Sequence, residues 1–346
     1  MKIILCAVAL VVFGSEAMAA DASLATDSEE DFIRDLESWE SAKTDRANAV
    51  AGAIWTLRSG HFIFGMPRLT DDRHNFTPEG FDSEQAGISV VVREGFVVAH
   101  FDQMKSPLWV AQRWTKFDHA RMLAEPSLDR PWREDLDLPL YTRGGTKYDG
   151  NDTHVDRGHM ARHAKNRAWG ADVSNWGVKM SNSTPQHRNI NRLGGTWGDL
   201  EDKARDIVVS SSFDIEAVWV YSGAIYRDQN NPDAESPDED FDEVVRLTMG
   251  GFGVPDATFK VIGWFDDSHN FQARAYVFEQ PHESRIVSGE QRPNFSLPDP
   301  KLPAEDYLVK IDDLEARIGV DFFPMLKNII EIIIESADNS DLWGAE

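Results

Sequence analysis

The sequence predicts an α+β domain with a mostly antiparallel central sheet flanked by helices. Runs rich in β-branched and aromatic residues, typical of strands, occur at 88–92, 96–101, 107–114, 217–221, 259–265 and 273–278. Patterns typical of helices lie between or after these strands, at 198–209, 311–318 and 323–334. Strands that mostly follow one another, with helices inserted, favour α+β architecture over a doubly wound sheet.

The first twenty residues have the pattern of a secretory signal peptide. Lys2 precedes an apolar run from Ile3 to Phe13, and small residues follow. Cleavage near Ala19 or Ala20 would direct the mature protein to a periplasm or the medium. That run is too short to cross a bilayer, and no later segment is long and apolar enough, so we expect no membrane anchor.

The remaining chain divides into three parts. We predict an N-terminal helical extension at 21–60, the main domain at 61–335 and a tail at 336–346. The only cysteine, Cys6, lies in the predicted signal, so the mature chain would have no thiol for a disulfide or a zinc site. The acidic stretch at 228–243 has little to bury and is expected to be an exposed loop. The oligomeric state is left open.

Charge is distributed unevenly along this acidic chain. The formal net charge is -24, which argues against a general affinity for nucleic acid or an anionic membrane. Between Arg157 and Arg192, however, five Arg and two Lys face a single acid, Asp172, a local balance of +6. A polyanionic substrate would therefore be held locally, with steep salt dependence.

This cationic strip opens with Asp156-Arg157-Gly158-His159-Met160. If the segment is extended, Arg157 and His159 lie on the same face. A neutral imidazole can take a proton from water as a general base, and a guanidinium can hold phosphate oxygens through two hydrogen bonds. Gly158 would let the backbone approach a ligand closely. A structural His beside an Asp156–Arg157 ion pair is the alternative, which these residues alone would favour.

Amide and carboxylate oxygens at the far end of the strip suit magnesium, which binds few protein groups and keeps several waters. Asn182 and Asn191 supply amides, and Glu201 supplies a carboxylate. If Asn191 begins the helix that follows, Glu201 lies ten residues further on, nearly three turns, so the two side chains share a face. The alternative is an Asn-rich loop with turn-forming side chains.

Two other chemistries fit less well. His159 and His163 have the spacing of a helical zinc pair, but Met160 stands where the protease motif needs Glu, and no third ligand is evident. A Ser-His-Asp triad is compatible with the composition, yet the chain has no Gly-x-Ser-x-Gly motif.

Taken together, these motifs resemble the DNA/RNA non-specific endonuclease family of the ββα-metal type. The resemblance extends from about Gly87 to Phe323 and includes the strands around the strip. Its motif residues are Asp156-Arg157-Gly158-His159-Met160, Ser181-Asn182, Thr184-Pro185-Gln186, Asn191, Trp197 and Leu200-Glu201.

The resemblance implies a ββα-metal nuclease fold and a role for each matching residue. His159 would be the general base, Arg157 a phosphate clamp, and Asn191 the direct magnesium ligand. Glu201 would hold the metal's water, and Arg130 would be a further phosphate contact.

Other residues of the strip complete the predicted site. Arg188 and Arg192 are expected to bind substrate, whereas Asp156, Gly158 and Asn182 are expected to support the motif. The segment between Asn191 and Trp197 is longer than the family pattern, so Asp199 is an alternative to Glu201 as the acidic residue.

The expected function is that of a secreted endonuclease that hydrolyses DNA and RNA to products with 5′-phosphate ends. Its cofactor would be Mg²⁺, with Mn²⁺ as an alternative. Two other functions remain open: a catalytically inactive nucleic-acid-binding protein of the same fold, and a metal phosphodiesterase for small substrates.

Overall fold

The computed structural model describes the main part of the chain. The described residues are 67–69, 87–93, 95–124, 131–145, 155–162, 178–192, 195–209, 217–226, 244, 246–247, 250–266, 270–280, 282–287, 290–295 and 303–326. The predicted signal peptide, helical extension, acidic loop and tail lie outside these residues, as do Arg130 and His163.

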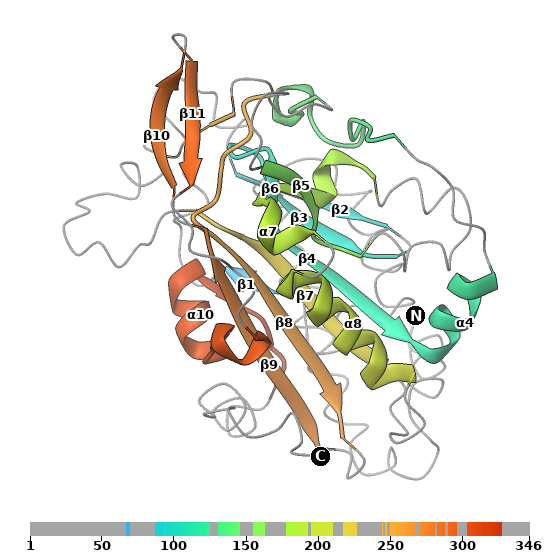
Figure 1. Cartoon of the computed structure of the whole chain (residues 1–346). Coiled ribbons are helices and arrows are strands. Elements are labelled where there is room, and N and C mark those ends of the chain that lie inside the picture. The colour runs from blue at the N-terminus through green and yellow to red at the C-terminus, as the bar shows by residue number, and fades with distance from the viewer. Residues whose placement is uncertain are drawn as a thin grey trace.

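Seven strands form one sheet in which every neighbouring pair is antiparallel (Figure 1). Their order across the sheet is β12-β9-β8-β7-β4-β3-β2. The strands are β2 (Ile88–Val92), β3 (Val97–Phe101), β4 (Ser106–Thr115), β7 (Ala217–Ile225), β8 (Ala257–Phe265), β9 (Phe271–Glu279) and β12 (Leu308–Val309). The predicted α+β class with an antiparallel sheet is confirmed.

Smaller elements surround this sheet. The helices are α4 (Lys116–Ala124), α7 (Arg188–Asn191), α8 (Thr196–Val209) and α10 (Ile311–Ile318), with 3-10 turns η2 (Leu140–Thr142), η4 (Met180–Asn182) and η5 (Ala304–Tyr307). Three separate antiparallel pairs are β1 (Arg68–Leu69) with β13 (Val320–Asp321), β5 (Val155–His159) with β6 (Ser183–His187), and β10 (His282–Val287) with β11 (Glu290–Phe295). Figure 1 shows the β10–β11 hairpin projecting from the body of the molecule.

The two faces of the sheet have separate cores because successive strand residues point to opposite sides. Helix α8 covers one face, which includes Val110 and Ile262. Its buried apolar residues follow the helical repeat and so share one side of the helix: Trp197, Leu200, Ala204, Ile207 and Val208. Helix α10 packs on the other face, where Trp109, Tyr221 and Phe259 are fully buried.

Strand β7 is longer than predicted. The sequence predicts a strand at 217–221, followed by Gly223 as its end, but β7 continues to Ile225. A side chain at Gly223 would overlap the Leu108 carbonyl oxygen and the Phe259 ring. This glycine therefore permits close packing in mid-strand and does not mark a turn.

The last predicted helix does not begin where expected. Residues 323–326 are not helical, and the remainder of the predicted segment lies outside the described residues. Phe322 and Phe323 are fully buried, with ring centroids 5.6 and 5.8 Å from that of Tyr221. Packing of both consecutive rings against one core residue favours a turn over a helical start at this position.

One long segment is inserted between two paired strands. Thr115, the last residue of β4, pairs with Ala217, the first residue of β7. Between them the chain forms α4, the β5–β6 ribbon, α7 and α8. The whole cationic strip therefore lies in one segment whose two ends are paired neighbours in the sheet.

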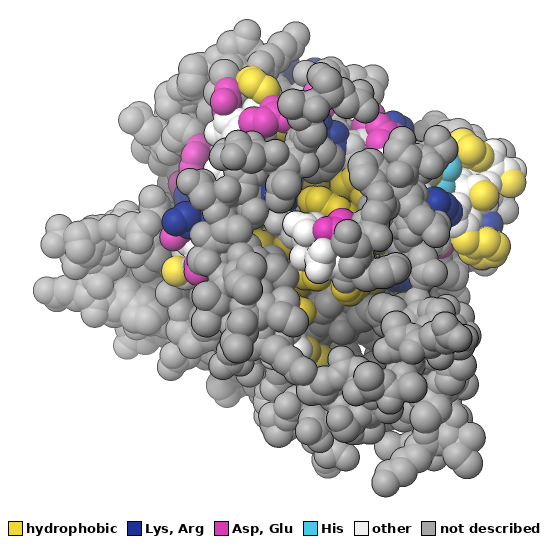
Figure 2. All heavy atoms as spheres, turned by 90° about the horizontal axis from the view of Figure 1, so that it is seen from below, with side chains coloured by type: hydrophobic (Ala, Val, Ile, Leu, Met, Phe, Trp, Pro, Cys, Tyr) yellow, Lys and Arg dark blue, Asp and Glu magenta, His cyan; other side chains and the backbone are white. Residues whose placement is uncertain are grey.

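The surface carries exposed apolar side chains on α4. Phe117 and Leu123 are 66% and 67% exposed, and Figure 2 shows hydrophobic and basic side chains gathered at the right edge, the side where Figure 1 places α4. Among the described helices, none has the length and hydropathy needed to cross a bilayer.

Candidate active site

The Asp156-Arg157-Gly158-His159 motif forms strand β5, which pairs antiparallel with β6. The segment is extended, so the condition stated from the sequence is met and Arg157 and His159 lie on the same face of the strand. Both side chains are half-buried. The ribbon therefore presents a cation and an imidazole side by side.

Gly158 is required for the contact between the two strands of the ribbon. A side chain at this position would overlap the Gln186 side chain. Gln186 is fully buried, and its Nε2 donates a hydrogen bond to Thr258 Oγ1 on β8 at 3.1 Å. The Gly158–Gln186 contact thus fixes the ribbon against the main sheet.

Asn182 holds the chain immediately after His159. Its Oδ1 accepts from the Ala161 amide at 2.7 Å, and its Nδ2 donates to the Ala161 carbonyl at 3.0 Å. The Asn182 carbonyl also accepts from the Met160 amide at 3.0 Å. Because Asn182 is fully buried and both ends of its side-chain amide are used, its contacts stabilise the backbone around the motif.

An aromatic ring lies against both functional side chains of β5. The Trp132 and His159 ring centroids are 4.4 Å apart with an interplanar angle of 33°. The Arg157 guanidinium carbon is 5.5 Å from the Trp132 ring centroid. Trp132 lies 24 residues before Asp156, the first motif residue, so only the fold brings it there.

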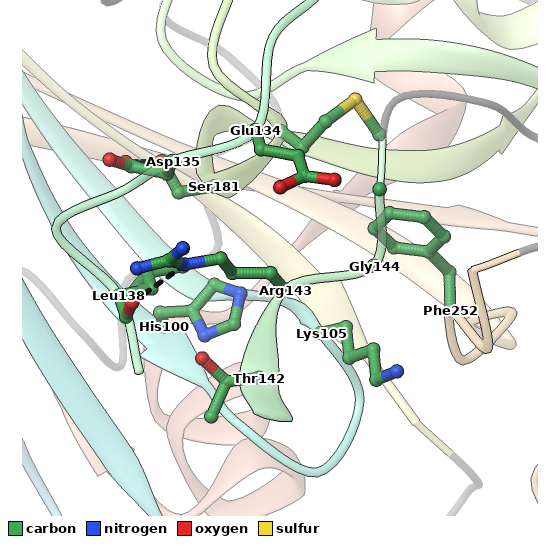
Figure 3. A pocket seen from close by; sticks show the side chains of 12 residues that line it. His100, Lys105, Glu134, Asp135, Leu138, Thr142, Arg143, Gly144, Ser181 and Phe252 are labelled. Atoms are coloured by element: carbon green, nitrogen blue, oxygen red, sulfur yellow. Dashed lines mark hydrogen bonds between the residues drawn. The ribbon is translucent and has the colours of Figure 1, made fainter. Parts of the chain in front are cut away.

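Glu134 and Asp135, which follow Trp132 closely in the sequence, line a small hollow (Figure 3). His100, Lys105 and Phe252 contribute to its lining. Arg143 does not point freely into it, because its Nε and Nη2 donate to the carbonyls of Leu138 and Leu136 at 2.8 and 2.7 Å. The hollow is thus bounded largely by groups engaged in local contacts.

On α7, Asn191 is held by Asp156. Its Nδ2 lies 3.4 Å from Asp156 Oδ2, and the Arg192 Nε and Nη2 donate to both oxygens of that carboxylate at 2.7 and 2.8 Å. Burial opposes ionisation of Asp156, but the hydrogen bonds from Arg192 and Asn191, with the charges of Arg192 and Arg188, hold its pKa below the usual value. Asp156 is therefore a stable anion that directs the Asn191 amide.

The expectation that Asn191 and Glu201 share one helix is wrong. Asn191 ends α7, whereas Glu201 lies in a separate helix, α8, that begins at Thr196. Gly195 donates to the Arg192 carbonyl at 2.7 Å, and a side chain on it would overlap the carbonyls of residues 189, 190 and 192. This tight turn breaks the helix, although α7 still packs against both β5 and α8.

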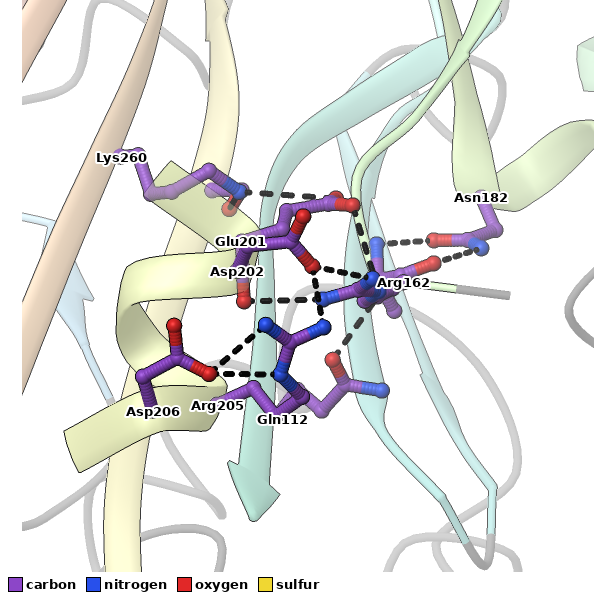
Figure 4. Close-up of polar contacts among 10 residues, drawn as sticks. Gln112, Arg162, Asn182, Glu201, Asp202, Arg205, Asp206 and Lys260 are labelled. Carbon is purple, nitrogen blue, oxygen red and sulfur yellow. Dashed lines mark hydrogen bonds and ion pairs between the residues drawn. The ribbon is translucent and has the colours of Figure 1, made fainter. Parts of the chain in front are cut away.

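Glu201 points into a cluster of cations (Figure 4). Its Oε1 is 3.9 Å from Lys260 Nζ, and its Oε2 is 3.6 Å from Arg162 Nε. Burial raises the pKa of Glu201, although the charges of Lys260 and Arg162 oppose this effect. Asp199, the alternative acidic residue, is exposed, so Glu201 is the inward-facing acid in the first turns of α8.

Lys260 is a buried base in β8 that the sequence predicts only as part of a strand. Only 1% of its side chain is exposed; its Nζ donates to Ser222 Oγ at 2.9 Å and lies 3.9 Å from the Trp197 ring centroid. Burial lowers the pKa of Lys260 to about 8, although the Glu201 charge opposes this. A lysine within the apolar run Phe259–Phe265 was the available signal.

Arg162 ties this cluster to the motif segment. Its Nη1 donates to the Glu201 carbonyl at 2.9 Å, its Nη2 pairs with Asp202 at 2.7 Å, and its guanidinium carbon lies 5.4 Å from the Trp114 ring centroid. Within the described residues, no group of three or more His, Cys, Asp and Glu side chains forms a metal-binding cluster.

The antiparallel sheet, the β5–β6 ribbon and the adjoining helices define a nuclease of the ββα-metal class. The chain belongs to the DNA/RNA non-specific endonuclease family, whose profile matches residues 75–328. It is thus an enzyme that hydrolyses nucleic acids, in a metal-dependent family, and the resemblance stated from its motifs is confirmed.

The fold is also similar to that of a solved nuclease. The chain matches a structure described as a crystal structure of the EndoG/EndoGI complex, concerning the mechanism of EndoG inhibition, with a TM-score of 0.54 and 18% identity. The match covers 78% of this chain and 92% of the other. No curated protein matches the chain significantly.

Proposed function

We propose that the chain is a magnesium-dependent endonuclease that cleaves phosphodiester bonds of DNA and RNA, leaving 5′-phosphate ends. One observation carries this proposal: β5 presents Arg157 and His159 on one face, while α7, which bears Asn191, packs against both β5 and α8. The three elements that carry the predicted base, ligand and acid are therefore brought together.

In this proposal His159 acts as the general base. Its imidazole accepts a proton from water, and the water oxygen attacks phosphorus opposite the 3′-oxygen. The new oxygen–phosphorus bond forms as the bond to the 3′-oxygen breaks, and that oxygen takes a proton from solvent. General-base catalysis of this kind contributes about 10²- to 10⁴-fold.

Arginine side chains would hold the scissile phosphate. Arg157 lies beside His159 on β5 and is the primary candidate, and Arg188 is half-buried at the start of α7. Arg192 already uses two nitrogens on Asp156, so we assign it first to holding that carboxylate and second to substrate. Arg130, outside the described residues, stays a prediction as a further phosphate contact.

The residues present fit a hard divalent cation. Because the Asn191 Nδ2 faces Asp156, its carbonyl oxygen is directed elsewhere and is the kind of ligand that magnesium or manganese accepts. Glu201 would help to hold the ion. When bound, the cation would neutralise charge on the phosphate and the leaving oxygen.

The test is cleavage of plasmid DNA and of RNA, with magnesium and with a chelator. His159→Ala should lower turnover about 10²- to 10⁴-fold while the fold persists. His119→Ala, on α4 outside the proposed site, is the matched control and should cleave normally. Normal cleavage by His159→Ala would remove the assigned base.

The same assay separates the alternative functions. An inactive binding protein would shift the mobility of DNA without shortening it. A phosphodiesterase for small substrates would hydrolyse a chromogenic diester without competition from long DNA. Either result would contradict the proposed nuclease activity.

We also propose that the protein is exported, because the first twenty residues have the pattern of a signal peptide. Expression of the full chain in a bacterium, followed by mass spectrometry of the periplasmic fraction, should find a new N-terminus next to Ala19 or Ala20. An intact Met1 on protein confined to the cytoplasm would contradict this.

A further inference from the structure

A tryptophan remote in sequence contacts both proposed functional side chains of β5. The Trp132 ring lies 4.4 Å from the His159 ring, centroid to centroid, and 5.5 Å from the Arg157 guanidinium carbon. The 33° tilt between the two rings places the indole partly over the imidazole. One side chain thus restricts how both the base and the cation can move.

The backbone that carries Trp132 is itself fixed to the ribbon. The Arg133 amide donates to the Val178 carbonyl at 3.0 Å, and the Arg133 carbonyl accepts from the Met180 amide at 2.9 Å. This bridge joins the Trp132 segment to the residues that enter η4 and then β6, the partner strand of β5. The indole and the motif therefore belong to one hydrogen-bonded unit.

A buried ion pair fixes the same segment on its other side. Asp135 pairs with Arg93 at 2.7 Å and accepts a hydrogen bond from Ser181 Oγ. The indole also packs partly buried against an apolar cluster that includes Met180 and Phe252. Trp132 is therefore held by a fixed backbone and by apolar packing, as a side chain that orients others must be.

We propose that Trp132 is a positioning residue, which holds the His159 ring in the orientation needed to accept a proton and keeps the Arg157 guanidinium beside it. This inference rests on the proposed function of His159 and Arg157. A flat, rigid ring suits this role because a misplacement of the base by about 1 Å can cost about 100-fold in rate.

Two substitutions separate stacking from mere filling of space. Trp132→Phe keeps a flat ring, whereas Trp132→Leu keeps an apolar side chain without one. With magnesium and plasmid DNA, Trp132→Leu should lower kcat about 10- to 100-fold with little change in KM, and Trp132→Phe should recover most of that loss. Phe117→Leu, at an exposed aromatic of α4, is the control and should leave cleavage unchanged.

A double-mutant cycle tests whether the indole acts through its neighbours. In the His159→Ala and Arg157→Ala backgrounds, Trp132→Leu should cost much less than in the wild type, because the side chain that it orients is gone. Melting temperatures of all variants report whether the fold is retained. A purely structural role would lower the melting temperature and leave kcat of the folded fraction unchanged.

The inference is overturned if the effects are additive in both backgrounds, if Trp132→Phe is as impaired as Trp132→Leu, or if only stability changes. Its failure is distinct from that of the proposed function. His159→Ala alone reports on the assigned base, and the coupling between substitutions reports on Trp132.

Discussion

Two carboxylates with cationic neighbours, Asp135 and Glu201, behave in opposite ways. Asp135 has 1% of its side chain exposed, and the Arg93 Nη2 is 2.7 Å from its Oδ1. Burial opposes its ionisation, but the Arg93 charge and hydrogen bonds from Ser181, Arg93 and the Asp137 amide hold its pKa below the usual value. Glu201 is 16% exposed, yet its nearest cations are at 3.6 and 3.9 Å, and burial raises its pKa.

The contrast indicates that the distances to neighbouring cations distinguish a structural carboxylate from one that can serve in a functional site. Asp135 uses both oxygens in short hydrogen bonds, so it stabilises the fold as an anion. The cations nearest to Glu201 lie further away, at 3.6 and 3.9 Å, so it is the better candidate to contact another cation. We interpret the first as a structural pair and the second as part of the proposed metal site.

The largest expected effect is on stability, through Asp135→Asn. Loss of the charge leaves Arg93 poorly compensated, and we expect the free energy of unfolding to fall by about 3 kcal/mol in urea denaturation. Asp137→Asn is the matched control: Asp137 also contacts Arg93, at 2.5 Å, but is 62% exposed, so it should cost about 1 kcal/mol or less. Equal losses would contradict the comparison.

The second effect is on activity, through Glu201→Gln. Cleavage of DNA should fall about 100-fold because the carboxylate that helps to hold the cation is lost. The free energy of unfolding should fall by less than in Asp135→Asn, because the cations nearest to this carboxylate are at 3.6 and 3.9 Å. Asp199→Asn, in the same helix but exposed, should remain active. A severe loss in Asp199→Asn with a mild one in Glu201→Gln would reverse the assignment.

The third effect concerns acid. Because the pKa of Asp135 is lowered on folding, its contribution to stability is complete above its unfolded pKa of about 3.9 and is lost as pH falls through the folded value. Unfolding free energies measured below pH 4 should therefore decline less steeply in Asp135→Asn, by up to about 1.4 kcal/mol per pH unit. Parallel curves for the two proteins would contradict this.

The smallest effect is expected at Asp156, which is intermediate in exposure and has short contacts to Arg192. Arg192→Lys removes the two-point contact to this carboxylate while keeping the charge. We expect the melting temperature to stay the same and cleavage to fall by about tenfold at most, since Asn191 is held less firmly. A change in stability without one in cleavage would make Asp156 a purely structural acid.

Sequence reasoning was sufficient where the signal is local. The alternation of side chains along a strand placed Arg157 and His159 on one face, and strand-forming runs located the sheet. The joint helix considered for Asn191 and Glu201 is wrong because the chain turns at Gly195, and a Gly pair within a helical pattern is a signal for such a break.

Contacts between distant segments could not be predicted in this way. Nothing in the sequence near Trp132 shows that the fold places it against His159. Lys260 is visible as a charge in an apolar strand, but its neighbours Glu201 and Trp197 come from α8 across the core. Such contacts depend on how the sheet and the helix pack, and neither the spacing of apolar residues nor the composition specifies this packing.

The pairing of Thr115 with Ala217 has a consequence for engineering. Since the entire stretch between them, α8 included, starts and finishes at adjacent positions, it could be exchanged as one unit without lengthening or shortening either strand. The sheet could then accept the corresponding segment of another nuclease.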